Sequence, residues 1–172
     1  MAGLPNFRCL LAALALVAPS LAEAAPVAPN VNATGTATIT NPASLRKLND
    51  LNFGNLSVTT AGTATVNPTT EALTTTGGAI VAGGLHYSAL FEAVSPVKNV
   101  VIIRIPKTAT TVTRVGGTET MTVDNWTLSG NSNRNVVAKE PFQFNVGGTL
   151  YVNANQVEGL YVGTFTVDIQ YP

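Results

Sequence analysis

Apolar and polar side chains alternate at every second position in several separate stretches of this chain, among them residues 33–40, 85–91, 142–152 and 161–171. A period of two residues is the spacing of a β-strand whose two faces meet different surroundings. No stretch after residue 24 carries the 3.6-residue spacing of an amphipathic helix. The pattern therefore predicts a domain built from strands alone.

One alternating stretch is compatible with two structures. Five of its apolar residues share one parity across Gly147-Gly148: Phe142, Phe144, Val146, Leu150 and Val152. A tight hairpin at the two glycines would place the last two of them on the opposite face from the phenylalanines. One continuous strand keeps all five on the same face. We favour the continuous strand.

Other local signals predict further strands. The parity of the apolar residues changes between Val123 and Trp126, which predicts a β-bulge near residues 124–125. Residues 100–105 are apolar on both faces, which is typical of a central strand buried between layers. Residues 51–54 predict a strand that ends at its glycine.

Turn signals separate these strands, at residues 61–62 and again at Asn67-Pro68. In the strand expected over residues 85–91, Leu85 lies on the apolar side and His86 on the polar side, so we expect His86 to face water. Many short strands with regular turns predict a single antiparallel β-sandwich, immunoglobulin-like or pilin-like, after an N-terminal signal peptide.

The first residues predict export. Arg8 precedes a short apolar run, and Ala22-Glu23-Ala24 then offers small residues at the positions that a signal peptidase reads. We expect a signal peptide over residues 1–24, a flexible leader over 25–32 and the β-sandwich domain over 33–172. The mature protein would be periplasmic, on the cell surface or extracellular, with no membrane span.

Charge and residue usage argue against several kinds of function. Nine Lys and Arg residues balance nine Asp and Glu residues, so the chain has no basic surface for nucleic acid. A single His and a single Cys argue against His- and Cys-based metal sites. The carboxylates are scattered and no nucleophile motif is present. We therefore expect no enzyme activity, no catalytic or metal-binding residues and no cofactor.

Several motifs resemble a known family. The chain has Leu51-Asn52-Phe53-Gly54, residues 117–123, residues 146–150 and Asn155-Gln156, and it closes with Gly163-Thr164-Phe165-Thr166-Val167. Together these resemble domain of unknown function family 4402, a group of exported bacterial β-domains, over about residues 34–171. The resemblance implies an exported β-sandwich and no established activity.

The last strand shows a looser resemblance to chaperone–usher pilus subunits, including the spore-coat-U-like kind. In those subunits the last strand alternates, has a penultimate aromatic residue and has a glycine fourteen residues from the end. The residues here that match, and that the resemblance implies for assembly, are Gly159, Tyr161, Phe165, Val167, Ile169 and Tyr171. The cysteine pair common in pilus subunits is absent.

Two functions follow as hypotheses. The first is an exported structural or adhesive cell-surface protein, of pilus type, which assembles with copies of itself or related subunits by strand addition and with help from a periplasmic chaperone. Its candidate donor segment has small or apolar residues at alternate positions, including Val27, Val31, Ala33 and Gly35. The alternative is a secreted carbohydrate- or surface-binding β-sandwich module, with Trp126 or Tyr151 in a shallow site.

Overall fold

The computed structural model describes residues 43–170, and every regular element within them is a β-strand. The eleven strands of this part of the chain are β1 (Ser44–Asn49), β2 (Asn52–Val66), β3 (Leu73–Tyr87), β4 (Ala89–Val94), β5 (Asn99–Arg104), β6 (Thr110–Arg114), β7 (Thr120–Leu128), β8 (Asn133–Val136), β9 (Pro141–Val152), β10 (Tyr161–Val162) and β11 (Asp168–Gln170). They form two antiparallel sheets. The predicted all-β sandwich is therefore confirmed for the described residues.

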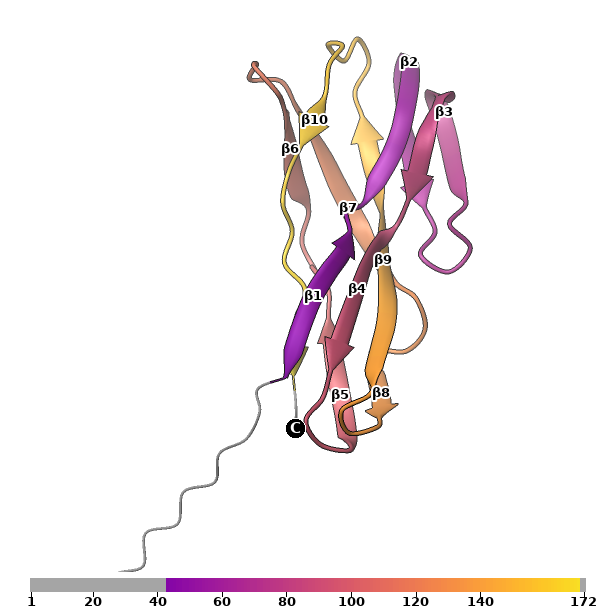
Figure 1. The fold of residues 1–172 in the computed structure, drawn as a ribbon. Coiled ribbons are helices and arrows are strands. Elements are labelled where there is room, and N and C mark those ends of the chain that lie inside the picture. Colours follow the sequence, from indigo (N-terminus) through magenta and orange to yellow (C-terminus); the bar gives the residue numbers. More distant parts are fainter. Residues whose placement is uncertain (1–42, 171–172) are drawn as a thin grey trace, which may run out of the picture. The chain divides into compact units, whose positions relative to one another are not determined.

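Strand β9 is the centre of the larger sheet, in which the order is β1-β4-β9-β7-β6-β10 (Figure 1). Along one edge β9 pairs first with β4, through Phe144, and then with β2, through Leu150. Along its other edge it pairs with β7. The smaller sheet has the order β11-β5-β8.

The buried apolar side chains form two clusters, and β9 contributes to both. The first cluster joins the two sheets and contains Ala89, Phe91, Ala93, Ile103, Phe144, Val146 and Val167. The second lies along the other half of β9 and contains Ala64, Met121, Val123, Leu150 and Val152. Removal of these side chains from water is the main force that holds the strands together.

The continuous strand predicted across Gly147-Gly148 is confirmed, because β9 runs through both glycines without interruption. A Cβ atom on Gly147 would overlap the carbonyl oxygen of Val66 and lie 2.8 Å from Cδ of Pro68. Glycine at this position therefore lets the turn between β2 and β3 lie directly against β9.

Two other local predictions are confirmed. The pairing of β7 with β9 shifts register between Asp124 and Thr127, and Asn125 has a φ of 49°, so β7 contains the expected bulge. A turn follows Asn67, whose side-chain oxygen accepts hydrogen bonds from the backbone amides of Thr69 and Thr70.

The prediction that Gly54 ends a strand is wrong. Gly54 lies inside β2 with a φ of 71°, and the strand continues to Val66. The signal at residues 61–62 lies inside β2, where the pairing of β2 with β3 shifts register between Val58 and Gly62. This irregularity divides β2 into a first half, residues 52–58, and a second half, residues 62–66. Among the described strands, the first half pairs only with β3, and the second half also pairs with β9.

The interpretation of residues 100–105 is only partly correct. Strand β5 is central in its sheet, as expected, but its side chains are not buried on both faces. Val101 and Ile103 are buried, whereas Val100 is 37% exposed. The smaller sheet therefore packs on the core with one face and presents the other face to solvent.

The expected orientation of residues 85–91 is wrong at its beginning. Leu85 is 79% exposed, whereas His86 is half-buried and its Nδ1 atom is buried without a hydrogen-bond partner among the described residues. Gly83 and Gly84 have positive φ values, which interrupt the regular alternation of β3 just before this point. The alternation expected from Ala89 and Phe91 onward is present in β4.

Several predictions fall on residues outside those described. These are the signal peptide, the leader, the strand over residues 33–40 and the penultimate residue Tyr171. Within residues 43–170, no helix is long and apolar enough to cross a membrane.

Candidate functional site

The last segment of the described chain belongs to both sheets. Strand β10 pairs with β6, with Tyr161 opposite Arg114, and so lies in the larger sheet. Strand β11 pairs with β5, with Ile169 opposite Ile103, and so lies in the smaller one. The single alternating strand expected over residues 161–171 is therefore divided, because its two ends have different partners.

Four of the residues predicted to act in assembly point toward the core. Tyr161 packs against the second cluster, Phe165 and Ile169 pack against the first, and Val167 is buried in the first. Gly159 lies in the loop before β10 rather than in the strand, with a φ of 146°. A Cβ atom there would lie 2.9 Å from Cδ of Arg114.

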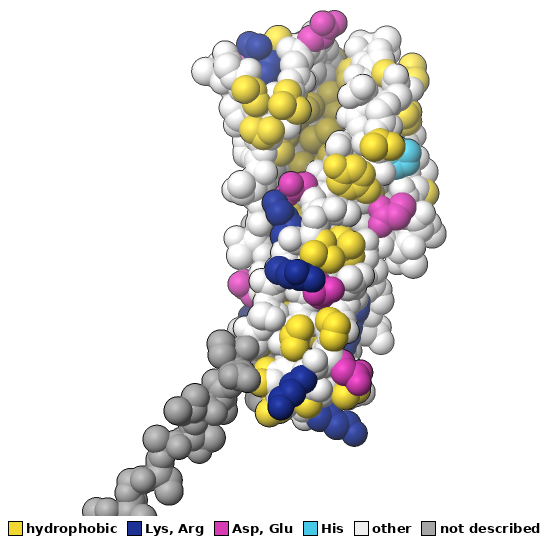
Figure 2. Space-filling model, in the orientation of Figure 1, with side chains coloured by type: hydrophobic (Ala, Val, Ile, Leu, Met, Phe, Trp, Pro, Cys, Tyr) yellow, Lys and Arg dark blue, Asp and Glu magenta, His cyan; other side chains and the backbone are white. Residues whose placement is uncertain are grey.

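A hollow bordered by apolar side chains lies above the second cluster. Phe53, Leu56 and Val58 from the first half of β2 pack against the cluster, as do Val112 of β6 and Tyr161 of β10. In Figure 1, β2 lies across from β6 and β10. Figure 2 shows the surface hollowed in this region, with hydrophobic side chains at the bottom of the hollow. We call this hollow the apolar groove.

Both sides of the apolar groove end in unpaired strand edges. In the described part of the chain, β10 pairs only with β6, and residues 52–58 of β2 pair only with β3. An unpaired edge presents a row of free backbone N–H and C=O groups to any strand that approaches. The groove thus combines an apolar floor with hydrogen-bonding edges, which is the combination that an added strand needs.

The outer edge strands differ in how they are protected. Strand β1 carries charges, and its Arg46 lies 2.6 Å from Glu92, whose pKa is lowered by hydrogen bonds from Gln143 and Arg46. Within residues 43–170, strand β3 pairs only with β2, and it contains no Asp, Glu, Lys or Arg. Charges on an edge strand normally prevent pairing with other chains. The edge of β3 is therefore open to association.

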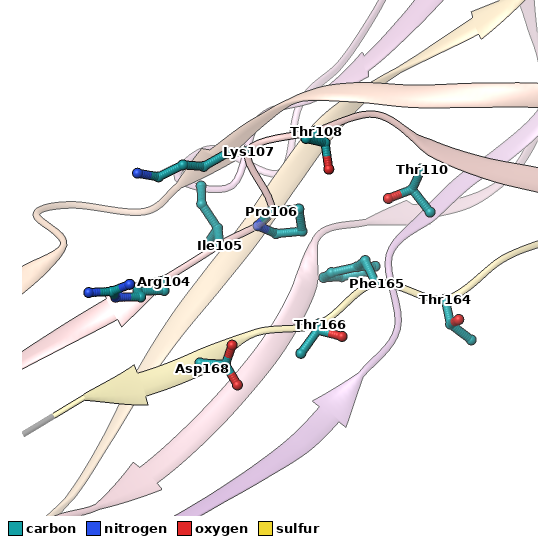
Figure 3. A pocket seen from close by; sticks show the side chains of 10 residues that line it. All are labelled: Arg104, Ile105, Pro106, Lys107, Thr108, Thr110, Thr164, Phe165, Thr166 and Asp168. Atoms are coloured by element: carbon teal, nitrogen blue, oxygen red, sulfur yellow. The ribbon is translucent and has the colours of Figure 1, made fainter.

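A separate cavity of about 500 Å³ lies between the β5–β6 connection and the segment that joins β10 to β11 (Figure 3). Its polar side chains are those of Arg104, Lys107, Thr108, Thr110, Thr164, Thr166 and Asp168. Its apolar lining comes from Ile105, Pro106 and Phe165. The cavity brings together charged and hydroxyl groups from two regions about 60 residues apart in sequence.

The aromatic residues predicted for a binding module have separate locations. Trp126 is half-buried, and its ring lies 4.5 Å from that of Phe165, so it stands behind the cavity and packs in the core. Tyr151 is partly exposed, and its hydroxyl oxygen accepts a hydrogen bond from Nδ2 of Asn125 at 2.6 Å. The structure does not bring Trp126 and Tyr151 together in one site.

Sequence reasoning missed the cavity residues Arg104, Lys107 and Asp168. Each is an exposed residue without a local motif, and the segments that carry them are far apart in the chain. The short segment from Arg104 to Thr110 offered a signal, because it contains two cations, a proline and two threonines at the end of an apolar strand. Within the described residues, no group of three or more His, Cys, Asp and Glu side chains has a geometry that could hold a metal ion.

Comparison with known proteins adds a family and no named relative. A family model described as Domain of unknown function (DUF4402) matches residues 38–171. Searches of curated proteins and of solved structures found no match. The geometry of this chain is therefore the main source for a functional proposal.

Proposed function

Because the chain belongs to the DUF4402 family, whose description assigns no activity, we propose its function from the geometry: an exported structural or adhesive protein of the cell surface that assembles by strand addition. The partners are copies of the same chain or related subunits, and a periplasmic chaperone protects the subunit before assembly. The apolar groove between β10 and the first half of β2 is the observation that carries this proposal.

The groove supports strand addition because both kinds of interaction are available in one place. An incoming strand gains backbone hydrogen bonds from a free edge, and its alternate side chains enter the groove. Leu56 and Val58 border the groove, whereas Ser57 between them is exposed. Apolar side chains thus face the groove at every second position of β2, and an added strand would likewise place every second side chain in the groove.

The donor in this proposal is the segment that contains Val27, Val31, Ala33 and Gly35, which lies outside the described residues. It has no charged residue between positions 25 and 40, and small or apolar side chains occupy alternate positions. Small side chains allow a donor strand to approach a groove whose floor is already largely filled. Each copy would then supply a donor segment to its neighbour.

The edge of β3 adds a second route for association between copies. It is 15 residues long, it lacks Asp, Glu, Lys and Arg, and Ile80, Val81 and Leu85 on it are exposed. Such an edge is unusual on a protein that functions alone in solution. It supports a role in which the subunit is surrounded by other chains.

The first test is the state of assembly of the mature chain, beginning at Ala25. Light scattering after size-exclusion chromatography should show a concentration-dependent series of species for this chain. A variant that begins at Asn41 lacks the donor segment and should lose this series, with at most a pair of copies joined through the edge of β3 remaining. Addition of a periplasmic chaperone should hold the full mature chain as a one-to-one complex. A mature chain that stays monomeric at every concentration would contradict strand addition.

The second test identifies the acceptor. The only cysteine, Cys9, lies in the predicted signal peptide, so engineered cysteines in the mature chain have no competitor. Gly35→Cys combined with Val58→Cys should give a ladder of disulfide-linked species on a non-reducing gel. The matched pair Gly35→Cys with Ser57→Cys should give little, because Ser57 points away from the groove. Equal crosslinking of both pairs argues against the groove as acceptor.

A further inference from the structure

The cavity shown in Figure 3 exists because two chain segments of unequal length connect the same two strand pairs. In the backbone ladder of β5 with β11, Arg104 lies opposite Asp168. In the ladder of β6 with β10, Thr113 lies opposite Val162. Between these pairs the chain runs through eight residues on one side, 105–112, and through five on the other, 163–167. The longer segment cannot follow the shorter one residue by residue, so the two separate and leave a space between them that is open to solvent.

Both walls of the cavity are fixed to one indole ring. Nε1 of Trp126 donates a hydrogen bond to the carbonyl oxygen of Thr108 at 3.2 Å. The same ring packs on Phe165 at 4.5 Å, and Phe165 in turn meets Phe91 of the core edge-on at 6.3 Å. A cavity whose walls are held in this way is formed before any ligand arrives, which lowers the entropy cost of binding.

The lining of the cavity is rich in hydroxyl groups and has an excess of positive charge. Four of its ten lining residues are threonines, and the charged ones are two cations, Arg104 and Lys107, with one carboxylate, Asp168. These three take part in none of the ion pairs formed by the described residues. Their hydrogen-bonding capacity is therefore available to a ligand.

We propose that this cavity binds an acidic saccharide, a polyhydroxylated ring that carries a carboxylate. The volume of about 500 Å³ lies within the usual range of small-molecule sites. Arg104 and Lys107 would hold the carboxylate through charge-assisted hydrogen bonds. Asp168 and the threonine hydroxyls would bond the ring hydroxyls, and the half-buried face of Phe165 would contact the apolar side of the ring.

The cavity and the apolar groove share no lining residue, although β6 and the segment 161–168 contribute to both. A protein that proves monomeric would overturn strand addition and would leave saccharide binding intact. Conversely, a protein that polymerises but binds no acidic saccharide would overturn saccharide binding alone. The cavity thus gives the alternative function, a carbohydrate-binding module, a defined location and a class of ligand.

Trp126 provides a direct readout, because it is the only tryptophan in the chain and contacts both walls of the cavity. Titration of the mature protein with trigalacturonic acid should change its fluorescence in a saturable way, with matching heat in calorimetry. The neutral trisaccharide cellotriose should produce neither signal. A hexaglutamate peptide tests whether the site instead accepts any acidic chain.

The variant Arg104→Ala/Lys107→Ala should weaken binding of trigalacturonic acid by about tenfold or more, with its thermal unfolding unchanged. The matched variant Arg46→Ala/Lys98→Ala removes two exposed cations elsewhere and should bind as the unmodified protein does. Absence of both signals with trigalacturonic acid overturns the proposal. Equal binding of cellotriose, tighter binding of hexaglutamate, or full affinity in the Arg104→Ala/Lys107→Ala variant would overturn it as well.

Discussion

Both carboxylate oxygens of Glu71 accept hydrogen bonds from Ser88, one from the backbone amide and one from the hydroxyl, each at 2.6 Å. Nδ2 of Asn145 adds hydrogen bonds to Glu71 Oε1 and to Ser88 Oγ, both at 2.9 Å. Glu71 has a φ of 60° in the turn between β2 and β3, Ser88 precedes β4, and Asn145 lies in β9. One carboxylate thus joins three parts of the larger sheet.

The Glu71→Gln substitution should destabilise the protein by about 1–3 kcal/mol, because the new amide group cannot accept from both donors of Ser88. Ser88 is almost completely buried, so water cannot replace the lost partner. Urea unfolding followed by circular dichroism measures the change. Glu140→Gln, at an exposed carboxylate, serves as the control and should stay within about 0.5 kcal/mol.

Arg134 should be irreplaceable even by lysine. Its guanidinium donates to the carbonyl oxygens of Gln143 at 2.9 Å, Asn131 at 3.1 Å and Ser129, and so links the smaller sheet to the larger. Arg134→Met should cost about 1–3 kcal/mol, since these carbonyls lose their partner. Arg134→Lys should recover only part of the loss, because an ammonium group lacks the planar set of donors. Full recovery in calorimetric unfolding would show that charge alone matters.

Acid should remove the stabilisation that the Arg114–Glu119 ion pair gives to the loop between β6 and β7. A hydrogen bond from Arg114, 2.6 Å away, lowers the pKa of Glu119 from 4.5 to about 2. Since the pKa is lower in the folded state, the ion pair stabilises the fold above pH 4.5, and this contribution is lost as the pH falls through about 2. Glu119→Gln should flatten the dependence of unfolding on pH in that window. An unchanged pH profile in the variant would refute this assignment.

His86 should tolerate an apolar replacement. Its Nδ1 atom is buried without a partner in the described part of the chain, and its backbone pairs with Phe53 across β2 and β3. His86→Phe removes an unsatisfied polar atom and places two aromatic rings opposite each other. We expect equal stability or a gain of up to about 1 kcal/mol in thermal unfolding. A clear loss would mean that Nδ1 has a partner, such as an ordered water.

Sequence alone predicted the parts of the fold that depend on neighbours along the chain. The shared parity on both sides of Gly147-Gly148 identified β9 as one strand, and the change of parity after Val123 identified the bulge in β7. In both cases the same residues that form the pattern also form the structure. Alternation is informative there because each strand buries one face against a single core.

Prediction failed where the backbone leaves the regular strand conformation or where the partner strand is distant. Gly83 and Gly84 reverse the expected orientation of Leu85 and His86, and no count of apolar positions includes such a φ change. The division of the last strand between β6 and β5 depends on pairings across more than 45 residues. The groove and the cavity arise from those distant pairings, so periodicity did not predict them.

The division of the last segment between two sheets has a mechanical consequence. Residues 161–162 are bonded to β6 in one sheet, and residues 168–170 are bonded to β5 in the other. A pulling force on this segment is therefore carried by both sheets, and the sheets cannot be drawn apart until one of the two short ladders breaks. The segment thus joins the two sheets, and its two short ladders are where the domain would first yield under such a force.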